Sequence, residues 1–189
     1  MQGKAATLAY MAWAAGKNGD KDRERHLNIE AARALASVRA WVDLVTVLGN
    51  LGTLEGPDSA AFLAQAVWLS LRVAVPVDEA VATVGALLVK VGPEAESGPL
   101  IARAAMFIAQ TRGEKHPKRE ELQEEALAML GACASARKVE PKKFGEWIES
   151  QRLNDPSYFM PALDKALEGM VGEDGWLFDR ALVASSAGG

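Results

Sequence analysis

The chain has few of the residue types that build metal centres, disulfide frameworks and nucleophilic active sites. Its 189 residues include one cysteine, Cys133, and two histidines, His26 and His116. A single cysteine excludes a disulfide framework and a cysteine-rich zinc module. The two histidines are far apart, and the acidic residue at helical spacing from each makes only a weak metal-binding pair. We therefore expect no metal, no cofactor and no enzymatic activity, with an enzyme whose site is scattered over several helices as an alternative.

The sequence also lacks an apolar run of the length that a membrane span requires, about 20 residues. The longest candidate, 73–91, is interrupted by a proline and three charged residues. The net charge of −4 disfavours non-specific binding to nucleic acid or to an anionic membrane. The alanine-rich segment 5–15 fits a helix better than a cleaved secretory signal, which is the alternative. Together with the unpaired cysteine, these features favour a cytoplasmic location.

Prolines and glycines divide the chain at regular places. Proline suits the first turn of a helix, and glycine suits the residue just past its end. Between these marks, apolar residues recur at spacings of three and four, which is typical of amphipathic helices. The pattern predicts an all-α protein of about nine to ten helices, at 4–16, 20–37, 38–52, 57–74, 78–91, 99–112, 117–136, 141–151, 157–171 and 174–183.

An internal repeat is the most informative feature of the sequence. A shift of 36 residues places Leu8 on Leu44, Gly16 on Gly52 and Leu27 on Leu63, and a further 40 residues leads to Val84. Chance similarity between alanine-rich helices is the alternative. The repeat predicts helix, glycine turn, helix units that stack side by side and share one apolar seam. We expect a single all-helical domain over 1–184, repeat-like over 4–112 and helical over 117–184, with a flexible tail at 185–189.

The residues around Trp41 give this repeat a family resemblance. Trp41, Leu44, Leu48 and Gly52 resemble the first-helix spacing of tetratricopeptide repeats, and the alanine-rich helix that follows is loosely similar. The pattern departs from the family after Leu44, because the family has a Leu-Gly pair there and this chain has Val45 in place of the glycine. The resemblance covers about 4–112. It implies an antiparallel helix-hairpin array, either a tetratricopeptide-like α-solenoid or a right-handed helical repeat, with a protein-binding groove lined by the first helix of each pair.

Polar residues along these first helices are the candidate partner-binding site. In the second hairpin they recur at i, i+4, i+7 and i+11, so they form one stripe opposite Leu44 and Leu48. The repeat shifts add Tyr10 from the first hairpin and three residues from the third. The full set is Tyr10, Arg39, Asp43, Thr46, Asn50, Glu79, Thr83 and Lys90. A solvated helix face without a partner is the alternative.

Two basic clusters flank the predicted helix 117–136. They are Lys115, Lys118 and Arg119 before it, and Arg137, Lys138, Lys142 and Lys143 after it. Such clusters are usually solvated, but as a pair they suggest an alternative function, an all-α accessory subunit of a nucleoprotein complex. Nucleic acid is therefore a possible but less favoured partner than a protein or peptide.

The five tryptophans complete the prediction. Trp13, Trp41 and Trp68 are expected to fill the seams between repeats. Trp147 and Trp176 lie in an aromatic-rich C-terminal part, which is expected to cap the array, with a docking surface as the alternative. The function that the sequence favours is a non-enzymatic protein–protein interaction module, an adaptor, scaffold or sensor arm of a larger assembly.

Overall fold

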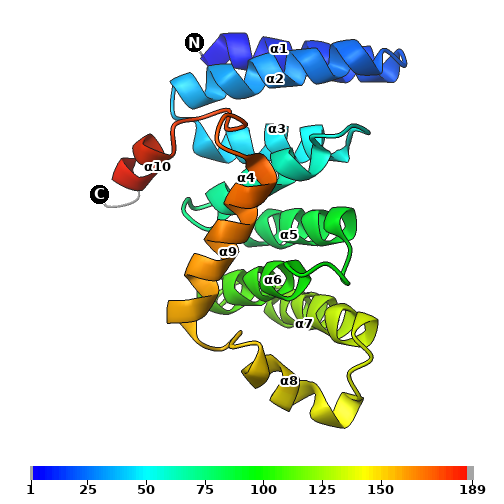
Figure 1. Cartoon of the computed structure of the whole chain (residues 1–189). Helices are drawn as coiled ribbons and strands as arrows, with labels where there is room; N and C mark the ends of the chain where they lie inside the picture. Colours follow the sequence, from blue (N-terminus) through cyan, green and yellow to red (C-terminus); the bar gives the residue numbers. More distant parts are fainter. Residues whose placement is uncertain (1, 187–189) are drawn as a thin grey trace. The chain divides into compact units, whose positions relative to one another are not determined.

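A computed structural model describes residues 2–186, and this part of the chain is all helical, without a strand (Figure 1). The elements are α1 (Gln2–Lys17), α2 (Lys21–Ser37), α3 (Trp41–Thr53), α4 (Ser59–Ser70), α5 (Val77–Val91), α6 (Gly98–Arg112), α7 (Arg119–Ala136), the 3₁₀ helix η1 (Pro141–Lys143), α8 (Phe144–Ser150), α9 (Pro156–Val171) and α10 (Arg180–Ser186). The predicted all-α class is confirmed. The helices pack as neighbouring pairs, as expected for an array of helix hairpins.

Nine of the predicted helices agree with the structure to within four residues at either end, and the last does not. The prediction started that helix at residue 174, but α10 begins at Arg180. Gly172 has φ 74°, which ends α9, and the backbone of Gly175 and Leu177 is hydrogen-bonded to the side chain of Gln65. Because these backbone groups are hydrogen-bonded to a side chain of α4, they do not need the hydrogen bonds of a helix.

The chain divides into two compact units. Unit 1 comprises Met1–Val75 and Met170–Gly189, and unit 2 comprises Pro76–Gly169. The single domain over 1–184 stays a prediction. Of the predicted tail 185–189, Ser185 and Ser186 end α10, and the remaining three residues lie outside the described part of the chain.

Unit 1 is built from α1, α2, α3 and α4, each packed against the next helix along the chain. Its core includes Leu44, Leu48 and Leu51 of α3, all without exposed surface. Gly52 was predicted in a turn but lies inside α3, where a Cβ atom would overlap the side chain of Leu63 on α4. Gly16, its counterpart in the repeat, lies inside α1, and a Cβ there would overlap the Glu24 carboxylate of α2. Gly52 therefore allows α3 and α4 to approach closely, whereas at Gly16 the flexible Glu24 side chain could move aside.

Unit 2 is built around α5, α6 and α7, with Leu87, Ile101 and Ile108 fully buried. Arg137, which follows α7, ties this core to the loop after α5. Its guanidinium donates hydrogen bonds to the carbonyls of Pro93 (2.6 Å) and Ala95 (2.6 Å). Between residues 2 and 186, no helix combines the length and the apolar character needed to cross a bilayer.

Candidate functional site

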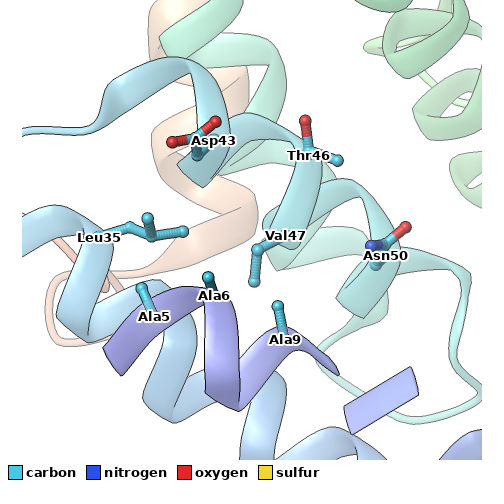
Figure 2. A pocket seen from close by; sticks show the side chains of 8 residues that line it. All are labelled: Ala5, Ala6, Ala9, Leu35, Asp43, Thr46, Val47 and Asn50. Atoms are coloured by element: carbon cyan, nitrogen blue, oxygen red, sulfur yellow. The ribbon is translucent and has the colours of Figure 1, made fainter. Parts of the chain in front are cut away.

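A groove of about 400 Å³ lies between the first helices of the two hairpins of unit 1 (Figure 2). Residues of α1, α2 and α3 line it, and we call it the α1–α3 groove. The lining residues are Ala5, Ala6, Ala9, Leu35, Asp43, Thr46, Val47 and Asn50. Three of these, on α3, belong to the polar stripe that the sequence singled out.

Small and apolar residues form the wall and the floor of the groove. Ala5, Ala6 and Ala9 come from α1, and their short side chains leave the space open on that side. Leu35 of α2 and Val47 of α3 are each only 6% exposed and form an apolar floor. An apolar floor beside small side chains suits the insertion of a bulky apolar group from a ligand.

Polar residues of α3 form the opposite rim. Asp43, Thr46 and Asn50 lie at i, i+3 and i+7 of one helix, so they follow one another along the groove, as Figure 2 shows. All three are exposed. Asp43 also lies in the first turn of α3, where a negative charge complements the helix dipole. The rim therefore offers a charge and an amide that donates and accepts hydrogen bonds.

Two exposed aromatic residues extend the α1 side of the groove. Trp13 follows Ala9 by four residues, so it lies one turn further along the same face of α1. It is 56% exposed, its ring centroid lies 5.7 Å from that of Tyr10, and Tyr10 is 67% exposed. The prediction that Trp13 fills a seam is wrong, because α1 buries Ala5, Leu8, Ala12 and Ala15 and leaves Trp13 more than half exposed. We call Tyr10 and Trp13 the open pair.

The other predicted binding residues lie outside the groove. Arg39 is exposed in the turn before α3, where its φ of 57° separates α2 from α3. Glu79, Thr83 and Lys90 belong to α5 of unit 2. Thr83 is buried, with its hydroxyl donating to the Glu79 carbonyl at 2.8 Å, so we leave it out of the candidate site.

The two basic clusters lie at opposite ends of α7. Because α7 has 18 residues, its ends are about 27 Å apart. Arg137 directs its guanidinium to backbone carbonyls, as described above, and Lys142 pairs with Glu140 at 3.4 Å. The seven basic residues therefore fall into two separate groups, one at each end of α7.

A second aromatic group, which we call the closed cluster, packs together in unit 1, with three of its four residues buried and Trp176 half-buried. It consists of Trp41, Trp68, Trp176 and Phe178. The predicted burial of Trp41 and Trp68 is confirmed, at 8% and 5% exposure. The aromatic-rich C-terminal part is divided between the units, because Phe159 packs on Phe107 in unit 2 instead.

Gln65 is the residue that sequence analysis missed. It has no exposed surface and lies in α4, where every residue from 62 to 70 is buried. A buried amide needs hydrogen-bond partners, and Gln65 finds them in Gly175 and Leu177. The available signal was the Gln65 amide, which is the one polar residue in the otherwise apolar stretch 62–69.

The Cys133 thiol and the His116 imidazole both have structural environments in this fold. Burial raises the pKa of Cys133 to about 11, so its thiol is protonated at neutral pH. The Nδ1 atom of His116 accepts the backbone N–H of Lys118 at 3.2 Å. Within the described residues, no cluster of three or more histidine, cysteine or acidic side chains has the arrangement of a metal site.

Comparison with known proteins gives this chain no relative: it matches no family model, no curated protein and no solved structure.

Proposed function

We propose that the chain is a non-enzymatic protein–protein interaction module that binds a segment of a partner protein in the α1–α3 groove. The observation that carries this proposal is the composition of the groove, with its apolar floor, small-residue wall, polar rim and adjacent open pair. An adaptor or scaffold role, and the tetratricopeptide-like nature of the array, belong to the same proposal.

The groove favours a helical or extended peptide that carries an apolar side chain. The volume of about 400 Å³ fits a small number of side chains and falls at the lower end of the range for ligand sites. An apolar anchor would contact Leu35 and Val47, and backbone groups of the peptide would find the Asn50 amide on the rim. Asp43 would attract a basic side chain or the positive end of a helix.

The open pair adds binding energy to this arrangement. Tryptophan and tyrosine are enriched among the residues that contribute most to protein–protein binding. More than half of the surface of each residue is exposed, and that exposed apolar area adds nothing to the stability of the fold. A partner that covered Trp13 and Tyr10 while inserting into the groove would bury that area on binding.

A pair of substitutions on α1 tests the proposal. Ala6→Arg fills the groove with a long charged side chain, and Thr7→Arg adds the same side chain at an exposed position that does not line the groove. Full-length tagged variants are used to capture proteins from the source cells, and the captured proteins are quantified by mass spectrometry. We expect Ala6→Arg to reduce recovery of one partner by about tenfold or more, and Thr7→Arg to retain it.

Circular dichroism checks that both variants keep the helical content of the original chain. If the two folded variants recover the same proteins in the same amounts, the groove is not the binding surface and the proposal fails.

A further inference from the structure

The non-helical segment between α9 and α10, residues 172–179, is held in unit 1 in the way that a receptor holds a peptide. We call it the strap. Gln65 of α4 donates from Nε2 to the Gly175 carbonyl at 3.1 Å and accepts the Leu177 N–H at its Oε1 atom at 2.8 Å. A side-chain amide that pairs with both a C=O and an N–H replaces the neighbouring peptide group of a sheet.

The two strap residues that alternate with this backbone pairing are the aromatic anchors. The Trp176 ring lies 5.5 Å from that of Trp68, edge to face, and the Phe178 ring lies 5.9 Å from Trp68. Phe178 also meets Trp41 of α3 at 6.2 Å and is 7% exposed. Backbone hydrogen bonds combined with pockets for alternate side chains are a general mode of peptide recognition.

The connection between the strap and α9 is short and exposed. Gly172, Glu173 and Asp174 are all exposed, and Gly172 adopts the left-handed backbone conformation at φ 74°. The receptor side is complete without the strap's own covalent link, because Trp41, Gln65 and Trp68 all come from α3 and α4. The Trp68 indole N–H is buried and has no hydrogen-bond partner, so the strap leaves one polar group of the site unsatisfied.

We infer that Trp41, Gln65 and Trp68 form an exchangeable peptide site, which holds the chain's own strap in cis and takes the strap of a second copy in trans. A second copy is the occupant because it carries the Gly-Trp-Leu-Phe sequence that this site fits. Reciprocal exchange of an identical segment between two copies of a chain is a common route to a dimer. The inference is independent of the proposed function, since the α1–α3 groove uses none of these residues.

The strap in cis competes with any strap in trans. Covalent attachment to the same chain makes binding of this strap intramolecular, so an added strap must compete with its effective concentration. The original chain should therefore bind an added strap weakly, and a chain with a weakened strap should bind it well.

The test uses the full chain with the double substitution Trp176→Ala and Phe178→Ala. Its ligand is a fluorescently labelled synthetic peptide of residues 172–186. By fluorescence anisotropy, we expect the double variant to bind the peptide at least about tenfold more tightly than the original chain does. A peptide with both aromatic residues replaced by alanine should not bind, and adding Gln65→Leu to the variant should abolish binding.

A second arm leaves the site and the strap unchanged, in case the double variant does not fold. A specific protease site is inserted between Glu173 and Asp174, and the purified full chain is then cut. We expect the cut segment to stay bound and to be displaced by excess peptide 172–186, but not by the alanine peptide. The inference is overturned if the double variant folds but does not bind the peptide. It is also overturned if neither peptide displaces the cut segment.

Discussion

Unit 1 carries two groups of aromatic residues that differ in burial: the closed cluster is largely buried, and the open pair is exposed. In the closed cluster, Trp41 and Trp68 are covered by Trp176 and Phe178 of the strap, and the rings of Trp41, Trp68 and Phe178 are less than a tenth exposed. In the open pair, Tyr10 and Trp13 contact each other and leave more than half of their surface in water. The open pair lies on α1 and Trp41 of the closed cluster lies on α3, which are the first helices of two hairpins that the sequence pattern makes equivalent.

The difference shows that the segments packed against a helix determine whether its aromatic residues are buried or exposed. α3 packs against both α2 and α4, and the strap covers its Trp41. α1 packs against α2 and buries Ala5, Leu8, Ala12 and Ala15, whereas its Tyr10 and Trp13 stay exposed. A buried ring contributes to the stability of the fold, whereas an exposed ring is available for binding.

The largest effect is expected from Phe178→Ala in the closed cluster. The substitution removes a 7%-exposed ring that contacts Trp41, Trp68 and Trp176. We expect the free energy of unfolding to fall by about 3–5 kcal/mol, measured by urea denaturation. Tyr10→Ala in the open pair is the control and should lower it by less than about 0.5 kcal/mol. Equal losses for the two variants would remove the distinction between the groups.

A smaller loss is expected from Gln65→Leu, which keeps the size of the side chain but leaves the Gly175 carbonyl and the Leu177 N–H without their partner. Because unsatisfied groups retain a desolvation cost, we expect about 1–3 kcal/mol of lost unfolding free energy. Gln151→Leu, at an exposed position after α8, provides the matched control. A stability unchanged by Gln65→Leu would show that the strap is held by its aromatic residues alone.

The smallest effect on stability is expected from Trp13→Ala. The ring is 56% exposed, so its removal should change the free energy of unfolding by no more than about 0.5 kcal/mol. Binding of the partner identified by capture should nevertheless weaken by about tenfold or more, as titration calorimetry would show. If instead stability falls and binding persists, then Trp13 belongs with the closed cluster in function and the comparison breaks down.

The sequence was a good guide to the helices because their signals are local. Proline at helix starts, glycine near helix ends and apolar spacing of three and four depend on neighbouring residues only, and nine helices were placed from them. The same patterns placed Asp43, Thr46 and Asn50 on one stripe, which the structure then shows beside a groove.

The parts that the sequence did not reveal depend on residues far apart in the chain. The bond between Gln65 and Gly175 joins positions 110 residues apart, and no local pattern indicates it. The strap was predicted as a helix because its intrinsic sequence permits one, but tertiary hydrogen bonds decided its conformation. The exposure of Trp13 was missed because tryptophan is usually buried, and only the packing of α1 shows that here it is not.

The most direct test of the account is site-specific photo-crosslinking inside cells. A benzoylphenylalanine residue is introduced at Asn50, on the rim of the α1–α3 groove, or at Leu127, an exposed position on α7 that is 48% exposed and outside the groove. We predict that irradiation links one partner protein to the Asn50 position, that Ala6→Arg abolishes this product, and that the Leu127 position does not form it. The same product from both positions, or no product from Asn50, would contradict the claim that the groove binds a partner.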